Sequence, residues 1–163
     1  MLKDLLVSKK SSVVDKWISL ILETYPSNGS KFLRLQKDRF SNPVGFTISN
    51  GAEEIFEEII NGGDIEKIKI FLNNIIKIRA VQNFSPSLAA GFIYSLKKVI
   101  RQELNQEIVD GKVLKELFEF ELNLDDLALI AFDLYMDAKE KIFKIRVDEI
   151  KSKDGMRING VLE

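Results

Sequence analysis

Residues 124–150 read LDDLALIAFDLYMDAKEKIFKIRVDEI, and this stretch decides the predicted fold. It contains no Pro and no Gly, so as a helix it would be about 40 Å long. Its first half is apolar almost all round between Leu127 and Met136. Because a helix that is hydrophobic on every side has to be covered by other elements, we expect this half to be buried.

The second half of the same stretch is amphipathic, since its apolar residues alternate with charged ones. This end of the helix is therefore predicted to emerge toward solvent or toward a partner. We expect Ile142, Ile145 and Val147 to form half of a dimer contact. Replacing Ile142 or Ile145 with Glu is then expected to give folded monomers.

The rest of the chain is divided into helices by local start and stop signals. Asn42-Pro43, Asp64 and Ser85-Pro86 are typical of helix starts, and Gly62-Gly63 is typical of a helix end. The polar residues 8–12 indicate a place where the first helix begins or bends. The expected helices cover residues 2–25, 44–61, 65–81, 86–107, 112–122 and 124–150, with a short helical turn at 31–37.

The fold class that follows is all-α, because no run of alternating apolar and polar residues indicates a strand. We expect one compact domain over residues 1–151, with about six helices around the long C-terminal one. Asn123 or Asp125 is expected to cap that last helix, and a kink there is the alternative. Residues 152–163 are predicted to be a flexible tail.

The composition excludes several classes of site. The chain has 163 residues and contains no Cys and no His, which removes disulfides, thiol nucleophiles, the commonest general base and the usual haem ligand. No cofactor is therefore expected. Lys and Arg number 24 against 25 Asp and Glu, so the basic excess typical of nucleic-acid binders is missing. No apolar stretch approaches the length of a membrane span, and a cytoplasmic location is expected.

Three groups of charged residues were weighed as functional sites, and for each a structural role is favoured. The acidic residues are expected to form a solvated face on the second long helix, or to cap the last helix. The basic residues are expected to form an ordinary helix face, with an acidic partner as the alternative. These groups are Glu53, Glu54, Glu57 and Glu58; Asp125 and Asp126; and Lys97, Lys98 and Arg101 with Lys77 and Arg79.

Nucleophilic catalysis at Ser41 or Ser85 is disfavoured, since the chain has no histidine base. Arg79 and Gln82 are harder to assign, because they lie just before Phe84-Ser85-Pro86. One interpretation is that they bind the free carbonyls at the end of their helix. The other is that they contact a partner or ligand at this corner.

Three motifs resemble the N-terminal domain family of RsbRD-type RsbT co-antagonists. The resemblance covers about residues 13–150 and adds Asn42, Phe84 and Tyr135 to the candidate partner or ligand contacts. The motifs are Phe40–Phe46 (FSNPVGF), Ile78–Ser87 (IRAVQNFSPS) with the segments AGFI at 90–93 and LKKVIRQEL at 96–104, and Ala131–Tyr135 (AFDLY) with Arg146 and Glu149.

The resemblance implies a sensory or scaffolding domain of bacterial stress signalling, as found in the stressosome. Relatives of this type are globin-like helical domains without haem that form dimers, and multidomain members carry a phosphorylated STAS domain. No phosphosite carries over here, and we expect a stand-alone module with a signalling partner that the sequence does not identify.

Two functions remain open at this point. The first is a non-enzymatic signalling module that dimerises and acts through its C-terminal helix. The second is a binder of a small apolar, fatty-acid-like ligand, in a pocket among the helices expected at 44–61, 65–81, 86–107 and 124–150. An enzyme is disfavoured because Asp, Glu, Lys or Tyr would have to do the chemistry alone.

Overall fold

All regular structure in the computed structural model of this protein is helical, which confirms the all-α prediction for the part of the chain that it describes, residues 1–26, 29, 33 and 38–161. Seven α-helices and one 3₁₀ turn lie in these residues. They are α1 (Leu2–Ser8), α2 (Lys10–Leu22), α4 (Pro43–Ile60), α5 (Ile65–Val81), α6 (Pro86–Ala90), α7 (Phe92–Glu103), η1 (Glu107–Val109) and α8 (Gly111–Val161). The helical turn expected at 31–37 falls outside the described residues, apart from Leu33.

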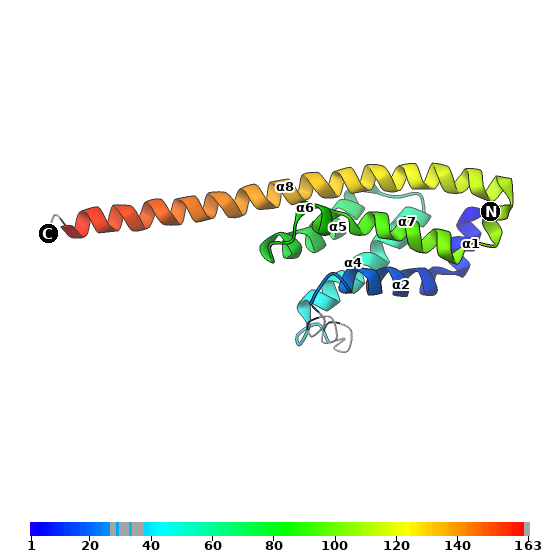
Figure 1. The fold of residues 1–163 in the computed structure, drawn as a ribbon, viewed down its shortest axis with the longest axis horizontal. Helices are drawn as coiled ribbons and strands as arrows, with labels where there is room; N and C mark the ends of the chain where they lie inside the picture. The colour runs from blue at the N-terminus through cyan, green and yellow to red at the C-terminus, as the bar shows by residue number, and fades with distance from the viewer. Residues whose placement is uncertain (27–28, 30–32, 34–37, 162–163) are drawn as a thin grey trace.

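The shorter helices pack beneath one long rod, the helix α8, which runs along one edge of the body (Figure 1). Helix α5 lies between α8 and α4, while α2 packs against both α4 and α7. The C-terminal part of α8 continues beyond the body, and the two chain termini lie at opposite ends of the molecule (Figure 1).

The predicted helix starts are confirmed, since each predicted capping side chain forms a hydrogen bond with the first turn of its helix. The side chains of Asn42, Asp64 and Ser85 accept hydrogen bonds from backbone N–H groups in the first turns of α4, α5 and α6. The predicted stop after α4 is also confirmed, since Gly62 and Gly63 adopt positive φ angles of 96° and 58°.

The first expected helix is divided at Lys9, within the polar stretch where a start or bend was predicted. Two further contacts anchor the start of α2. The ammonium of Lys9 donates to the Glu103 carbonyl at 2.5 Å and pairs with Glu107 at 2.7 Å. The break therefore lets α1 turn away while Lys9 ties the start of α2 to the end of α7.

The prediction of one helix over residues 86–107 is wrong, because Gly91 divides it into α6 and α7 and Glu103 ends it. The Gly91 N–H donates to the Ser87 carbonyl at 2.8 Å. A Cβ added at Gly91 would lie 2.2 Å from that carbonyl oxygen, closer than any real contact. Only glycine allows the chain to turn this tightly between the two helices.

The helices expected at 112–122 and 124–150 are one continuous helix, so the break or kink predicted between them is wrong. Asp110 marks the start instead, since its carboxylate accepts from the Lys112 N–H at 2.8 Å. With 51 residues, α8 is about 77 Å long. It continues to Val161, through residues expected to form a flexible tail, and the flexibility of that segment stays a prediction. Among the described residues, no helix is both long and apolar enough to cross a membrane.

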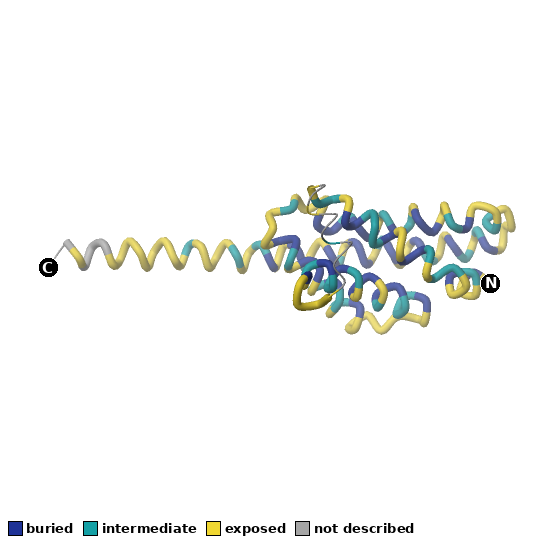
Figure 2. The backbone as a smooth tube through the Cα atoms, turned by 90° about the horizontal axis from the view of Figure 1, so that it is seen from below, coloured by how far each residue is buried: buried dark blue, intermediate teal, exposed yellow. Residues whose placement is uncertain are grey.

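Helix α8 is buried on one face only. The face that packs on the body contains mostly small and aliphatic residues: Leu124, Leu127, Ala128, Ala131, Tyr135 and Ala138. The opposite face is exposed at Leu129, Phe132 and Met136, so the expectation that this half is buried all round is wrong (Figure 2). Too few helices surround α8 to cover its outer side.

Candidate functional site

Four of the five residues predicted to contact a ligand or partner meet at the corner between α5 and α6. Arg79 is in the last turn of α5, Gln82 and Phe84 follow it, and Tyr135 reaches the corner from α8. Asn42 does not join them. Its buried side chain caps α4 and donates to the Leu33 carbonyl at 3.0 Å, which is a structural role.

Arg79 is fully buried at the centre of this corner. Its Nη2 donates to the Leu88 carbonyl at 2.6 Å and to the Thr24 hydroxyl at 3.1 Å. No described atom accepts a hydrogen bond from its Nε or Nη1. These hydrogen bonds differ from the interpretation that Arg79 binds the free carbonyls at the end of its own helix, because the accepting carbonyl belongs to α6.

Three aromatic rings surround the guanidinium of Arg79. Its carbon lies 4.4 Å from the centre of the Phe84 ring, 5.6 Å from Tyr25 and 6.0 Å from Phe92. Burial lowers the pKa of Arg79, and the nearby Tyr25 hydroxyl partly opposes that shift. Arginine remains cationic at neutral pH even so. Cation–π contacts, worth about 0.5–2 kcal/mol each, thus take the place of a carboxylate.

Tyr25 covers the corner from the end of α2, and the sequence analysis did not identify it. Its ring meets Phe84 edge to face at 5.0 Å, and its hydroxyl donates to Gln82 Oε1 at 2.8 Å. Burial raises the pKa of Tyr25, while the charge on Arg79 lowers it in part. Tyr25 lies more than 50 positions before Arg79 in the chain, so no local motif joins the two.

The corner is fastened to α8 at two positions one turn apart. The Tyr135 hydroxyl donates to the Phe84 carbonyl at 2.5 Å. The Lys139 ammonium donates to Asn83 Oδ1 at 3.1 Å, and Asn83 has the left-handed φ of 59°. Any rearrangement of the Arg79 corner would therefore act directly on α8, whose C-terminal part extends out of the body (Figure 1).

The exposed face of α8 carries apolar residues at intervals of seven. Residues seven apart lie at nearly the same angle on an α-helix, so they form one stripe. Their exposed fractions run from 42% to 69%, and Phe118 and Phe132 border them. We call these five residues the α8 stripe: Leu122, Leu129, Met136, Phe143 and Ile150.

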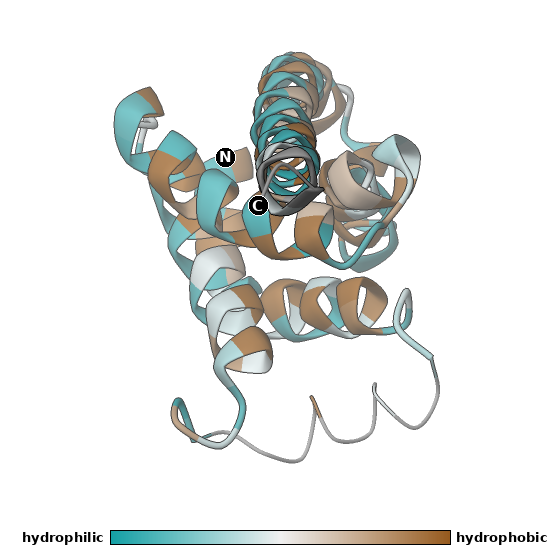
Figure 3. Ribbon diagram, turned by 90° about the vertical axis from the view of Figure 1, so that its left-hand side faces the viewer, coloured by the Kyte–Doolittle hydropathy of each residue, from teal (hydrophilic) through white to brown (hydrophobic). Residues whose placement is uncertain are grey.

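None of the helices that the structure describes lies over the side of α8 that faces away from the body (Figure 3), and the stripe residues are exposed. Beyond the body, from residue 143 to residue 156, every side chain except half-buried Val147 is exposed. We call residues 143–161 the arm. A single helix without tertiary contacts is only marginally stable in water, so the arm is an element that would gain from a partner.

The three predicted dimer contacts do not lie on one face. Ile142 is half-buried and packs against the core of its own domain, whereas Ile145 is exposed. Ile145 lies about 200° around the helix from Phe143, while Val147 lies within about 40° of it. Only Val147 borders the α8 stripe, and the role of all three residues in a dimer stays a prediction.

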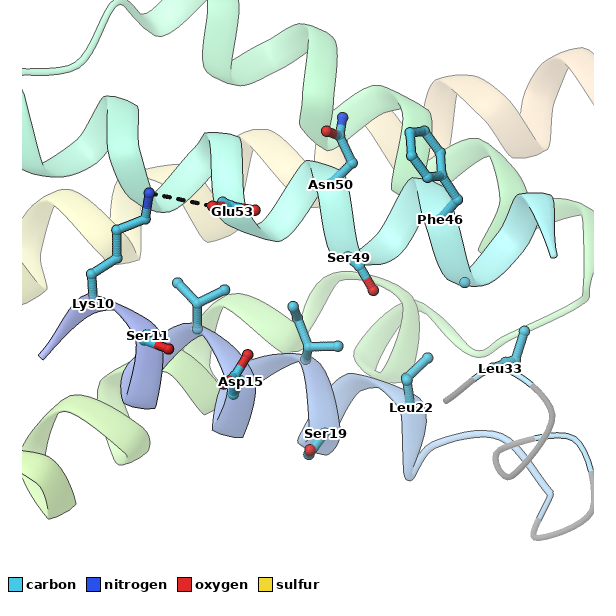
Figure 4. A pocket seen from close by; sticks show the side chains of 13 residues that line it. Lys10, Ser11, Asp15, Ser19, Leu22, Leu33, Phe46, Ser49, Asn50 and Glu53 are labelled. Atoms are coloured by element: carbon cyan, nitrogen blue, oxygen red, sulfur yellow. Dashed lines mark ion pairs between the residues drawn. The ribbon is translucent and has the colours of Figure 1, made fainter. Parts of the chain in front are cut away.

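A groove of about 740 Å³ separates α2 from α4 (Figure 4). Its wall includes Val14, Ile18, Leu22 and Phe46, and polar residues line its rim. Lys10 crosses one end of the groove, pairing with Glu53 at 3.3 Å. The groove is partly open to solvent and lies between α2 and α4, whereas the apolar pocket was predicted among the helices that the structure shows as α4 to α8.

The acidic residues of α4 that were a candidate site in the sequence form ion pairs with lysines of neighbouring helices. Lys10 binds Glu57 at 2.6 Å and Lys67 binds Glu58 at 3.2 Å, which ties the acidic face of α4 to α2 and α5. No cluster of three or more potential metal ligands occurs among the residues that the structure describes.

The basic residues of α7 bind acidic residues of α8. Lys97 pairs with Asp125 at 2.8 Å, so Asp125 is not a helix cap as predicted. Arg101 donates two hydrogen bonds, of 2.6 and 2.7 Å, to the carboxylate of the buried Glu121. This contact raises the pKa of Arg101. These pairs hold α7 and α8 together and occupy Lys97 and Arg101 of the predicted basic patch.

Comparison with known proteins gives one match. The model of a family described as the RsbT co-antagonist protein rsbRD N-terminal domain matches residues 11–149, most of the chain. No curated protein and no solved structure matches. The matched segment contains the Arg79 corner and ends within the arm of α8.

Proposed function

Because the chain belongs to the RsbRD N-terminal domain family of stress-signalling sensors, we propose that it is a non-enzymatic signalling module that works as a homodimer through α8. Family membership supports the sensory role. The residues favour binding to a partner over catalysis, since the chain has no His or Cys and its charged groups pair with one another across helices. The partner that receives the signal is a second protein in the cytoplasm.

The observation that carries this proposal is the α8 stripe. The stripe places one large apolar side chain in each of five successive heptads, which is half of the a and d pattern of a coiled coil, and such a seam favours contact with another helix. Fully burying one such side chain contributes about 1.5–3 kcal/mol, so leaving all five in water would be costly. A stripe that begins on the body and continues onto the arm favours a partner as long as α8 itself.

The Arg79 corner supplies the part of the proposal that concerns sensing. A signal needs two arrangements and a stimulus that favours one of them. Tyr135 and Lys139, which hold the corner, flank Met136, which lies on the α8 stripe. A stimulus that opens the corner would release these two contacts and change how α8 presents its stripe.

Two matched variants test the dimer contact by light scattering. Phe143→Glu places a charge on the α8 stripe, whereas Ile145→Glu places it on the other side of a helix at similar exposure, 69% against 59%. Because Ile145 lies away from the α8 stripe, we expect Ile145→Glu to stay a dimer like the wild type, in place of the monomer expected from the sequence. We expect Phe143→Glu to be a folded monomer. A dimer of Phe143→Glu would contradict the proposed contact, and a monomeric wild type would contradict dimerisation itself.

A small apolar ligand is the second candidate function, favoured by the groove between α2 and α4. The ligand would lie along Ile18 and Phe46, with a carboxylate toward Lys10 at one end. Titration with sodium decanoate tests this, with the fluorescence of Trp17 on the buried face of α2 as reporter. Saturable binding lost in Phe46→Asp supports it, and a linear response equal in both proteins would exclude it.

A further inference from the structure

A second hollow lies between α4 and α5, on a different face of α4 from the groove. Its volume is about 440 Å³, which is within the range of small-molecule sites. Asn50 borders both hollows, and its side chain is directed away from α2, whereas Ser49 is directed toward the groove (Figure 4). We call this hollow the α4–α5 pocket, and its lining includes Arg39, Phe46, Asn50, Phe71 and Asn74.

The α4–α5 pocket gathers hydrogen-bonding groups from three segments of the chain. Arg39 lies before α4, Asn50 belongs to α4 and Asn74 belongs to α5. Within the part of the chain that the structure describes, none of these three side chains forms a hydrogen bond or an ion pair. A guanidinium and two amides are strong hydrogen-bonding groups, so each can still bind a ligand.

The charge of the pocket is positive and comes from Arg39, the only charged residue among the described residues of its lining. The guanidinium carbon lies 5.5 Å from the centre of the Phe46 ring. This contact orients the guanidinium and leaves its N–H edge for a planar acceptor. The nearby carboxylate of Asp38 accepts instead from the Ser41 hydroxyl and the Phe40 N–H. The pocket therefore favours an anion.

The apolar part of the lining is aromatic. Phe46 of α4 and Phe71 of α5 are both half-buried. Gly51 lies between the helices, where a Cβ would be 2.9 Å from Ile75 Cδ1, so α4 and α5 pack closely beneath the pocket. Because aromatic pairs contribute more than their buried area alone, a ligand with a ring gains most from this lining.

From these groups we propose that the α4–α5 pocket binds a small aromatic carboxylate. The carboxylate accepts hydrogen bonds from Arg39, since a guanidinium and a carboxylate match in geometry. The ring packs against Phe46 and Phe71, and the amides of Asn50 and Asn74 orient the ligand. The site uses neither the α8 stripe nor a second copy of the chain, so it goes beyond the proposed function and does not rest on it.

Such a ligand would act on the helix that leads to the Arg79 corner. It would contact α4 and α5 together, and Asn74 lies about 7.5 Å along α5 from Arg79. A molecule that binds one arrangement of the two helices better than another shifts the population toward it. The α4–α5 pocket thus places a chemical stimulus within reach of the corner.

Titration of the full chain with sodium benzoate tests the site, with the side-chain amides of Asn50 and Asn74 as NMR reporters. We expect saturable shifts of both amides. Benzyl alcohol lacks the charge and acetate lacks the ring, so each should bind at least about fivefold more weakly. Inorganic phosphate separates the two kinds of anion. Phosphate binding as tightly as benzoate would overturn the assignment to an aromatic carboxylate.

The variants are made at Arg39 and Asn74, because these residues line the α4–α5 pocket and not the groove. Arg39→Gln should weaken benzoate binding by about tenfold, as expected when a hydrogen bond to a charged group is lost. Asn74→Asp should also weaken it, since the new carboxylate repels the ligand. Arg146→Gln is the matched control, because it removes an equally charged, exposed side chain from the arm and should leave the affinity unchanged.

Three results would overturn the proposal. They are shifts of the two amides that do not saturate, an affinity of Arg39→Gln equal to that of the wild type, and an equal loss of affinity in Arg146→Gln. None of them bears on the homodimer, because light scattering of the unliganded chain tests that separately. Backbone spectra of each variant that match the wild type confirm that the fold is retained.

Discussion

At the scale of single residues, Arg79 is a buried cation whose hydrogen-bond acceptors, among the residues that the structure describes, are a carbonyl and a hydroxyl and not a carboxylate. Arg79 holds the Leu88 carbonyl and the Thr24 hydroxyl within a cage of three aromatic rings. Burying a charge in this way is costly unless the surroundings compensate for it. The corner is therefore held closed by several contacts of modest strength, and loss of any one should be measurable.

Tyr135→Phe is the variant that tests the link between this corner and α8. It removes the donor to the Phe84 carbonyl and leaves the ring in place. We expect the free energy of unfolding to fall by about 1–2 kcal/mol, since a half-buried carbonyl loses its partner. Urea denaturation measures it. The control is Tyr94→Phe, which changes a half-exposed ring on α7 and should leave stability unchanged within error. Equal stability of both variants would show that the bond contributes nothing.

The sequence pointed to Arg79 and Gln82 by their position at the end of a helix, and the family motifs added Phe84 and Tyr135. It could not find Tyr25 or Thr24, which lie on another helix and approach only when the chain is folded. It also placed Asn42 among the contacts, although its side chain is occupied as a helix cap.

At the scale of helices, starts were predictable and continuity was not. Caps are decided within four residues, so Asn42, Asp64 and Ser85 are visible in the sequence. The continuity of α8 is decided by tertiary contacts. Asp125 has the chemistry of a cap, yet in the fold its carboxylate binds Lys97 of α7 and the helix passes through it.

Gly91→Ala tests why α6 and α7 are separate. The added methyl group would meet the Ser87 carbonyl, so the turn must open and the Arg79 corner must shift. We expect a loss of more than about 1 kcal/mol in the free energy of unfolding. Gly111→Ala is the control, because nothing lies within 4 Å of its added Cβ at the start of α8. If thermal unfolding gave the two variants the same midpoint, the steric argument would fail.

At the scale of the whole molecule, the sequence predicted only part of the arm, because the last helix was expected to end at residue 150 and it continues to Val161. An amphipathic end was expected to emerge from the body, and it does. Ile142, Ile145 and Val147 are close in sequence but spread around the helix, so their shared role in a dimer contact stays a prediction. Identifying the α8 stripe required knowing which side of α8 the body covers. The globin-like architecture implied by the family stays a prediction, since no solved structure matches the chain.

The central claim is that a second copy covers the α8 stripe. Backbone hydrogen exchange of residues 143–156 tests it most directly, measured at protein concentrations above and below dimerisation. In a monomer this segment is an unsupported helix and should exchange quickly. We predict strong protection at high concentration that is lost on dilution and in Phe143→Glu. Fast exchange at every concentration, with only the body protected, would contradict the claim.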